Sequence, residues 1–174
     1  RGEFLLLLNN DTEVRKHWLA TLLQTFTDFP DAGLVGARLV FADGTLQEAG
    51  GIVWRDGSAW NFGRGEDPNH PHYSYCRQVD YCSGACLMIA LDEFRVLGKF
   101  DTRYVPAYYE DTDLAFRVRE SGKKVYYQPN ASIIHFEGIT SGTDIGSGIK
   151  QYQQLNHDKF FKRWEETLKH HRPN

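Results

Sequence analysis

The chain has 174 residues, of which 41% are apolar and 25% are charged, an ordinary balance for one globular domain with a sizeable core. The formal net charge of −3 gives no general attraction to nucleic acid or to an anionic membrane surface, so neither partner is expected. No apolar run approaches the roughly 20 residues that a transmembrane helix needs, and no signal peptide is recognised. We therefore expect no transmembrane segment.

The first elements expected along the chain are a strand and a helix. Phe4–Leu8 is a short apolar run, which predicts a strand covered on both faces, as in an α/β sheet. Asp11 is well placed to cap a helix formed by residues 12–30. One face of that helix repeats apolar residues every four positions: Val14, Trp18, Leu22 and Phe26.

The middle of the chain predicts two hairpins and a second buried strand. Asp43-Gly44 and Asp56-Gly57 are typical of tight turns between strands. Residues 65–75 are polar and rich in proline, which indicates a surface loop. Residues 79–91 contain the next buried strand, and a short helix ending at Gly98 follows it.

The last third predicts two helices, separated by strands. Residues 111–122 form an amphipathic helix with Leu114, Ala115 and Val118 inward and Gly122 at its end. Two short strands are expected around Pro129, then a mobile Gly- and Ser-rich segment, and a final helix over 150–168. Strands and helices alternate around an inserted hairpin, which predicts a single α/β domain over residues 1–174 with a mixed sheet.

The three cysteines are Cys76, Cys82 and Cys86. An odd number without a two-residue spacing argues against a zinc knuckle or a disulfide framework. We expect reduced thiols that pack like small hydrophobic residues in a cytoplasmic protein.

Two acidic stretches raise the question of catalysis. Asp11 follows a buried strand, at the edge where open α/β sheets bind ligands, and its carboxylate with the Asn9 carbonyl could hold Mg²⁺ or Mn²⁺. The alternative is a turn that caps the next helix. Glu110, Asp111 and Asp113 lie beside Tyr108 and Tyr109, where a partly desolvated carboxylate could act as a general base. Ordinary helix-start acids are the alternative.

Two further stretches could complete a site. His135 follows an apolar run at a strand end, where an imidazole could bind a metal or a phosphate oxygen, although a half-buried histidine bonded to backbone is the plainer interpretation. Ser83 and Gly84 are small residues that would let a ligand approach the backbone, or would simply allow tight sheet packing.

Taken in order, these stretches resemble the inverting glycosyltransferases of sequence family 2, which have the GT-A fold, and are most similar to rhamnosyltransferase-like members that build polysaccharides. The resemblance covers nearly all of the chain and implies a nucleotide-sugar donor, a saccharide or lipid-linked acceptor and a cytoplasmic protein, at most peripheral to the inner membrane. It also implies that the family's N-terminal nucleotide-binding half is absent here. We then expect a chain that is poorly active or inactive alone, with an exposed Phe4–Leu8 edge through which it could form a homodimer.

The resemblance also implies roles for individual residues. Asn9-Asn10-Asp11 stands where the family has its Asp-x-Asp metal motif, so Asp11 would hold the divalent ion, Mn²⁺ or Mg²⁺. An asparagine replaces the first acid of that motif, which implies weaker metal binding. The other implied roles are Asp111 as the base beside Glu110, His135 at the metal, and Ile139–Gly148 as a segment that closes over the donor. Residues implied to bind the substrates are Asn9, Asn10, Ser83, Gly84 and Asp113, with Ser83-Gly84 at the sugars.

Two other functions remain open from the sequence. The first is a non-catalytic carbohydrate- or partner-binding remnant of the same fold, with sugar-stacking aromatic residues at Trp54, Trp60, Phe62 and Tyr73. Ordinary hairpin core is the alternative for these four. The second is a nucleotidyltransferase, which would normally show a Gly-rich phosphate loop with a nearby lysine, and we find none.

Overall fold

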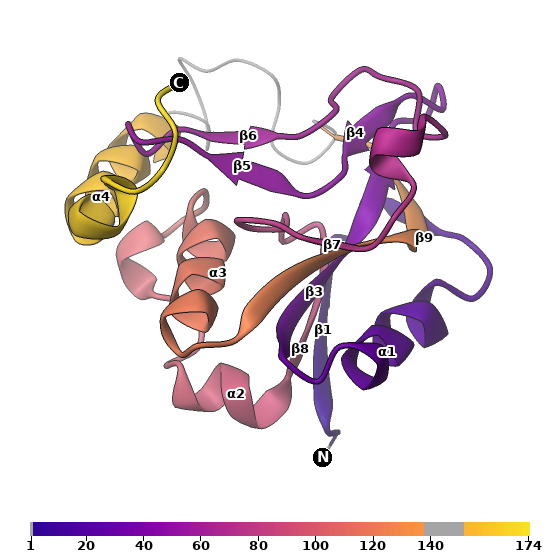
Figure 1. Ribbon diagram of the computed structural model, residues 1–174, viewed down its shortest axis with the longest axis horizontal. Helices are drawn as coiled ribbons and strands as arrows, with labels where there is room; N and C mark the ends of the chain where they lie inside the picture. The colour runs from indigo at the N-terminus through magenta and orange to yellow at the C-terminus, as the bar shows by residue number, and fades with distance from the viewer. Residues whose placement is uncertain (1, 138–151) are drawn as a thin grey trace.

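The computed structural model describes residues 2–137 and 152–174 (Figure 1). The segment Ile139–Gly148, which the family resemblance implies would close over the donor, lies outside the described residues. The expected surface loop, residues 65–75, contains a short 3₁₀ helix, Pro71–Tyr73. A second 3₁₀ helix, Thr102–Tyr104, lies between α2 and α3.

The main sheet is mixed, as expected. Its strand order is β1-β8-β3-β9-β2, and β4 and β7 pair with β3 and β9. Among the strands that the structure describes in this sheet, β3 and β9 are the one parallel pair, and the other pairs are antiparallel. The strands are β1 Phe4–Leu8, β2 Thr12–Val14, β3 Ala32–Val40, β4 Leu46–Glu48, β7 Arg77–Gln78, β8 Cys86–Ala90 and β9 Lys124–His135.

Helices cover both faces of this sheet (Figure 1). Because successive side chains of a strand point to opposite faces, Leu34 of β3 packs with residues of α3 and α4, whereas its neighbour Val35 packs with α1. The helices are α1 Trp18–Asp28, α2 Leu91–Val96, α3 Glu110–Glu120 and α4 Tyr152–Leu168. The expected α/β class with flanking helices is therefore confirmed.

A separate hairpin, formed by β5 Gly51–Val53 and β6 Ala59–Asn61, is the predicted insert. Both predicted turns are present, since Gly44 and Gly57 have φ of 89° and 81°, the left-handed region that glycine adopts without strain. The predicted inward face of α3 is also confirmed, because Leu114, Ala115 and Val118 are fully buried.

Two sequence predictions are wrong. Asp11 does not cap a helix: the next residues, Thr12–Val14, form β2, which pairs with the end of β9, and α1 begins only at Trp18. The open side of β9 offered these residues backbone hydrogen bonds, and that pairing outweighed their place in the helical pattern. Val14 is accordingly 43% exposed, although Leu22 and Phe26 do face the core.

The second error concerns Pro129. Instead of two short strands, β9 is one strand, and its pairing with β3 shifts from Gln128 directly to Ser132. The shift leaves Pro129 out of the ladder, which a residue without an N–H group requires.

The directions of the strands place the candidate site residues at one edge of the sheet. β1 and β3 are both antiparallel to β8, and β3 is parallel to β9, so β1, β3 and β9 all run the same way. Residues 9–11 follow β1, His135 ends β9, and Ser83-Gly84 precede the start of β8, which pairs with the end of β1. All three segments therefore meet at the same edge.

β1 is the terminal strand of this sheet. Its side chains are shared between the two core clusters, Leu5 and Leu7 on one face and Phe4 and Leu6 on the other. Homodimerisation through this strand remains a prediction. Among the described residues, no helix is both long and apolar enough to cross a bilayer. Cys76, Cys82 and Cys86 are free thiols, as expected.

Candidate active site

A cleft of about 920 Å³ opens at the sheet edge described above. Its lining includes Asn9, Asn10, Asp11, Ser83, Gly84, Glu110, Asp111 and His135, but not Asp113. The segment after β1, the segment before β8, the end of β9 and the first turn of α3 each contribute, and the β5–β6 hairpin forms a further wall.

Asp11 and His135 lie together on one side of the cleft. The pairing of Thr12 with His135, and a hydrogen bond of 2.9 Å from the Phe136 N–H to the Asp11 carbonyl, bring these neighbouring strands into contact. The Nε2 atom of His135 is 3.3 Å from Oδ1 of Asp11 and 3.3 Å from the Asn9 side-chain nitrogen. Both the Asp11 and the His135 side chains are largely buried, with 10% and 12% of their surface exposed.

The orientation of His135 is set by Gln47, which the sequence analysis did not identify. The Gln47 amide nitrogen donates to Glu137 at 3.1 Å, so its oxygen faces Nδ1 of His135 at 2.9 Å. An amide oxygen only accepts, so Nδ1 carries a proton, and in the neutral imidazole the lone pair is then on Nε2, the nitrogen beside Asp11. Arg64 in turn holds Glu137 through an ion pair of 2.6 Å. This relay resembles those that orient histidine ligands in metal sites.

Glu110 and Asp111 face the cleft from the start of α3. Asp111 accepts hydrogen bonds from the N–H groups of Gly84, at 2.9 Å, and Thr112, at 2.7 Å. Burial raises the pKa of Asp111 above its usual range, although these hydrogen bonds oppose the shift. Burial, reinforced by the Asp111 charge, raises the pKa of Glu110 to about 7. Carboxyls with raised pKa values are suited to take up a proton near neutral pH.

The turn before these acids is held in an unfavourable conformation. Tyr108 and Tyr109 have φ of 75° and 70°, in the left-handed region that residues other than glycine rarely adopt. The buried side-chain nitrogen of Asn156, on α4, donates to the carbonyls of Ala107 and Tyr108 at 2.7 and 3.2 Å, and the Tyr109 hydroxyl donates to the Gly57 carbonyl at 3.2 Å. Contacts with other elements therefore fix where α3 begins.

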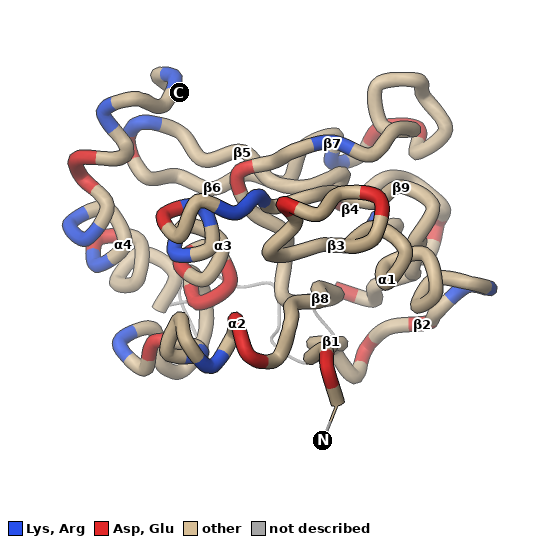
Figure 2. The backbone as a smooth tube through the Cα atoms, turned by 60° about the horizontal axis from the view of Figure 1, so that its bottom comes forward, with Lys and Arg blue, Asp and Glu red and all other residues tan. Residues whose placement is uncertain are grey.

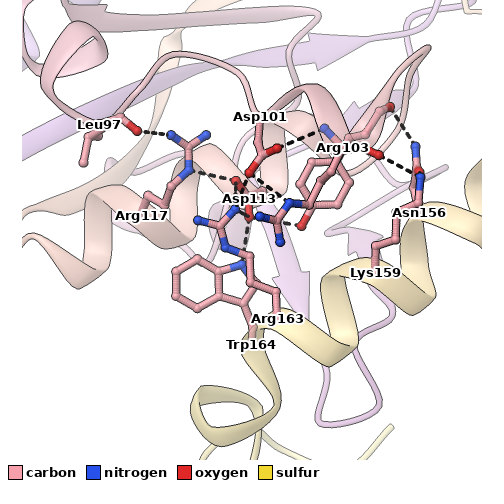
Figure 3. Close-up of polar contacts among 10 residues, drawn as sticks. Leu97, Asp101, Arg103, Asp113, Arg117, Asn156, Lys159, Arg163 and Trp164 are labelled. Carbon is pink, nitrogen blue, oxygen red and sulfur yellow. Dashed lines mark hydrogen bonds and ion pairs between the residues drawn. The ribbon is translucent and has the colours of Figure 1, made fainter.

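Asp113 has a different environment from the other two acids (Figure 3). Its side chain is completely buried and pairs with Arg117 at 2.8 Å and with Arg163 of α4 at 3.1 Å. It also accepts hydrogen bonds from the Tyr104 hydroxyl and the Trp164 indole N–H at 3.1 and 2.9 Å. The structure thus does not bring Asp113 to the cleft; its contacts join α3 to α4.

The four aromatic residues of the insert region separate into two groups. Phe62 and Tyr73 pack edge to face, with ring centroids 5.3 Å apart, in a small core cluster with Leu46. Trp60 instead lines the cleft and is 55% exposed, with Trp54 against it at 5.9 Å. Hairpin core is therefore the correct interpretation for the first pair, whereas Trp60 is available to a ligand.

Comparisons with known proteins indicate glycosyltransferases as the class. No family model matches the sequence. A solved structure of GalNAc-T7 with UDP, GalNAc and Mn²⁺ superimposes with a TM-score of 0.69 over 97% of this chain and 33% of that chain, at 15% identity. The fold is therefore that of a GT-A glycosyltransferase, as the sequence predicts.

Particular relatives agree with this class. The chain is 32% identical over 149 residues to the O-antigen biosynthesis protein RfbC of Myxococcus xanthus, covering 82% of this chain and 12% of the relative. It is 25% identical over 170 residues to the N-acetylglucosaminyl-diphospho-decaprenol L-rhamnosyltransferase of Mycobacterium tuberculosis, covering 87% of this chain and 53% of the relative. It is also 32% identical over 136 residues to the pre-mycofactocin glycosyltransferase of Mycobacterium tuberculosis, covering 76% of this chain and 27% of the relative.

The resemblance to rhamnosyltransferase-like glycosyltransferases is therefore confirmed. The chain spans about half, or less, of the length of the relatives described above.

Proposed function

We propose that this chain is the catalytic region of a glycosyltransferase, which transfers a sugar from a nucleoside diphosphate donor to a saccharide-type acceptor with inversion. The observation that carries the proposal is the convergence of Asp11 and His135 with Glu110 and Asp111 on one cleft. Sugar transfer needs a metal-binding pair to hold the diphosphate and a base to take the proton of the acceptor hydroxyl. Both must lie close enough together to reach the same bound substrates.

The reaction follows from the placement of Asp111. Its carboxylate takes the proton of an acceptor hydroxyl, and the oxygen attacks the anomeric carbon from the side opposite the diphosphate. The new carbon–oxygen bond forms as the bond to the diphosphate breaks, so the configuration inverts. The raised pKa of Asp111 makes it a stronger base than an exposed aspartate, and positioned bases contribute about 10²–10⁴-fold.

Asp11 and His135 would hold the divalent ion. Within residues 2–137 and 152–174, no three His, Cys, Asp or Glu side chains form a group that could hold a metal ion, so these two residues need oxygen ligands from the diphosphate and water. An imidazole nitrogen and a carboxylate oxygen suit Mn²⁺, and the relay through Gln47 presents the nitrogen in the form that binds metal. When bound, such an ion stabilises the charge of the leaving diphosphate.

The first prediction concerns this metal site. Calorimetric titration with UDP should show binding in the presence of Mn²⁺, and Asp11→Ala should abolish it because one of the two protein ligands is lost. Glu13→Ala removes the same charge from an exposed position two residues away and should leave binding intact. Metal-dependent UDP binding that survives in Asp11→Ala would show that Asp11 does not hold the ion.

The names of the relatives suggest the substrates. We propose a rhamnosyl or similar donor, and a saccharide or lipid-linked diphosphate acceptor, because one relative is named as an L-rhamnosyltransferase of such a lipid. A cytoplasmic location, peripheral to the inner membrane, is part of the same proposal because it would bring the cleft to a lipid-linked acceptor.

A second candidate function is a non-catalytic carbohydrate-binding module, and the exposure of Trp60 on the cleft favours it specifically. Either function uses the flat indole as a stacking surface for a sugar ring. Trp60→Ala should weaken the binding of rhamnose- or N-acetylglucosamine-containing oligosaccharides about tenfold, as followed by protein fluorescence.

Tyr75→Ala is the matched control for this experiment, because Tyr75 is also 55% exposed but does not line the cleft. Equal affinities for Trp60→Ala and the wild type would remove Trp60 from the binding surface. Saccharide binding without any sugar transfer or metal-dependent UDP binding would favour the non-catalytic function.

A further inference from the structure

Glu48 is a buried carboxyl that the reaction outlined above does not use. It ends β4, its side chain is 0% exposed, and it does not line the cleft. Its Oε1 accepts a hydrogen bond of 2.9 Å from the Ser83 N–H. Its Oε2 is also buried and has no hydrogen-bond partner among the described residues.

The Ser83-Gly84 dipeptide connects Glu48 to the candidate base. Two consecutive backbone N–H groups hold two carboxyls: Ser83 donates to Glu48, and Gly84 donates to Asp111 at 2.9 Å. Only Asp111 of these two carboxyls faces the cleft. A displacement of the dipeptide would therefore move the hydrogen bond that holds the base.

The surroundings of Glu48 do not favour a negative charge on it. Among the described residues, the groups that interact with it electrostatically include Asp111, Tyr81, Cys82 and Tyr127, and the cation Arg64. Burial, the largest effect, and the Asp111 charge raise the pKa of Glu48 to about 8, while the Ser83 N–H and Arg64 oppose the shift. At neutral pH the carboxyl is therefore mostly protonated.

We propose that Glu48 is a positioning residue that acts as a neutral carboxylic acid, fixing the Ser83-Gly84 backbone that in turn holds Asp111. The inference rests on the proposed function for its catalytic meaning, since Asp111 is the base only in that reaction. The protonation state and the positioning contact can be measured without any substrate.

The test compares Glu48→Gln with Glu48→Ala. Glutamine has the size of the protonated acid, carries no charge, and can still accept from the Ser83 N–H. Alanine removes the acceptor and leaves that N–H buried without its partner. We expect Glu48→Gln to transfer sugar at the wild-type rate at pH 7, and Glu48→Ala to lose on the order of 10²-fold in kcat while metal-dependent UDP binding is kept.

Two measurements do not need activity. The NMR amide proton of Gly84, which reports the bond to Asp111, should shift in Glu48→Ala and stay near its wild-type position in Glu48→Gln. Thermal unfolding should also distinguish a charged from a neutral Glu48 carboxyl. Because the folded pKa is raised above the usual 4.5 to about 8, the stability linked to this group is complete below about pH 4.5 and is lost as the pH rises to about 8.

Glu48→Gln should therefore gain in Tm relative to the wild type between pH 5 and pH 8. Glu66→Gln, which removes a carboxylate from an exposed position, is the control for loss of a charge. A pH-independent Tm difference for Glu48→Gln would overturn the neutral state, and an unmoved Gly84 amide in Glu48→Ala would overturn the positioning role. If both measurements agree with expectation but the wild type shows neither sugar transfer nor metal-dependent UDP binding, the proposed function fails while the assignment of Glu48 stands.

Discussion

Asp111→Asn is expected to abolish sugar transfer while leaving metal-dependent binding of UDP intact. Asparagine keeps the size of the side chain, but its one amide oxygen can replace only one of the two carboxylate oxygens, which accept separately from the Gly84 and Thr112 N–H groups. It cannot take the acceptor proton, so the loss in kcat should be about 10²–10⁴-fold. The measurement is release of nucleoside diphosphate from a panel of nucleoside diphosphate sugars in the presence of saccharide acceptors.

Glu110→Gln is the matched control, because Glu110 lines the same cleft and its pKa is also raised, to about 7. If transfer persists in Asp111→Asn and is lost in Glu110→Gln, then Glu110 is the base. Asp113 is no longer an alternative, since its carboxylate is occupied by Arg117 and Arg163 outside the cleft.

The pH dependence of transfer should have a definite sign. The base must be deprotonated to act, and burial raises the pKa of Asp111 above its usual range. The rate should therefore fall as the pH decreases, and the fall should begin at a higher pH than an exposed aspartate would give. An acid limb at the usual aspartate pKa would contradict the burial of the base.

Asp113→Asn is expected to cause the largest loss of stability of any single substitution considered for this chain. Asp113 is 0% exposed and compensates Arg117, which is 7% exposed, and Arg163 (Figure 3). The amide cannot neutralise these charges, and a buried charge without its partner costs about 3–5 kcal/mol. Arg117 also donates to the carbonyl of Leu97, so the loss should spread to the segment before α3.

Equilibrium unfolding in urea measures this effect. Asp92→Asn is the control, because its ion pair with Arg95 is mostly exposed and such pairs contribute only about 0–1 kcal/mol. Figure 2 shows acidic and basic residues along both α3 and α4. An Asp113→Asn variant no less stable than Asp92→Asn would show that the network does not hold α4 to α3.

The acidic residues of the cleft could be recognised from the sequence because each lies next to a strong local pattern. Asp11 follows an apolar strand, and Glu110 and Asp111 begin an amphipathic helix. Their convergence, however, depends on strand direction. The sequence could not show that β1 pairs with β8 rather than with a parallel neighbour, nor that Asp113 points away from the acids beside it.

The sequence by itself determined the elements whose cause is local. The spacing of Leu114 and Val118 is that of a helix face, and Gly44 and Gly57 permit turns that few other residues allow. The tertiary structure alone decided that residues 12–14 form a strand, and that Gln47 and Glu48 serve the site. Their partners, His135 and Ser83, lie 88 and 35 residues away, and burial or pairing over such distances leaves no periodic signal in the chain.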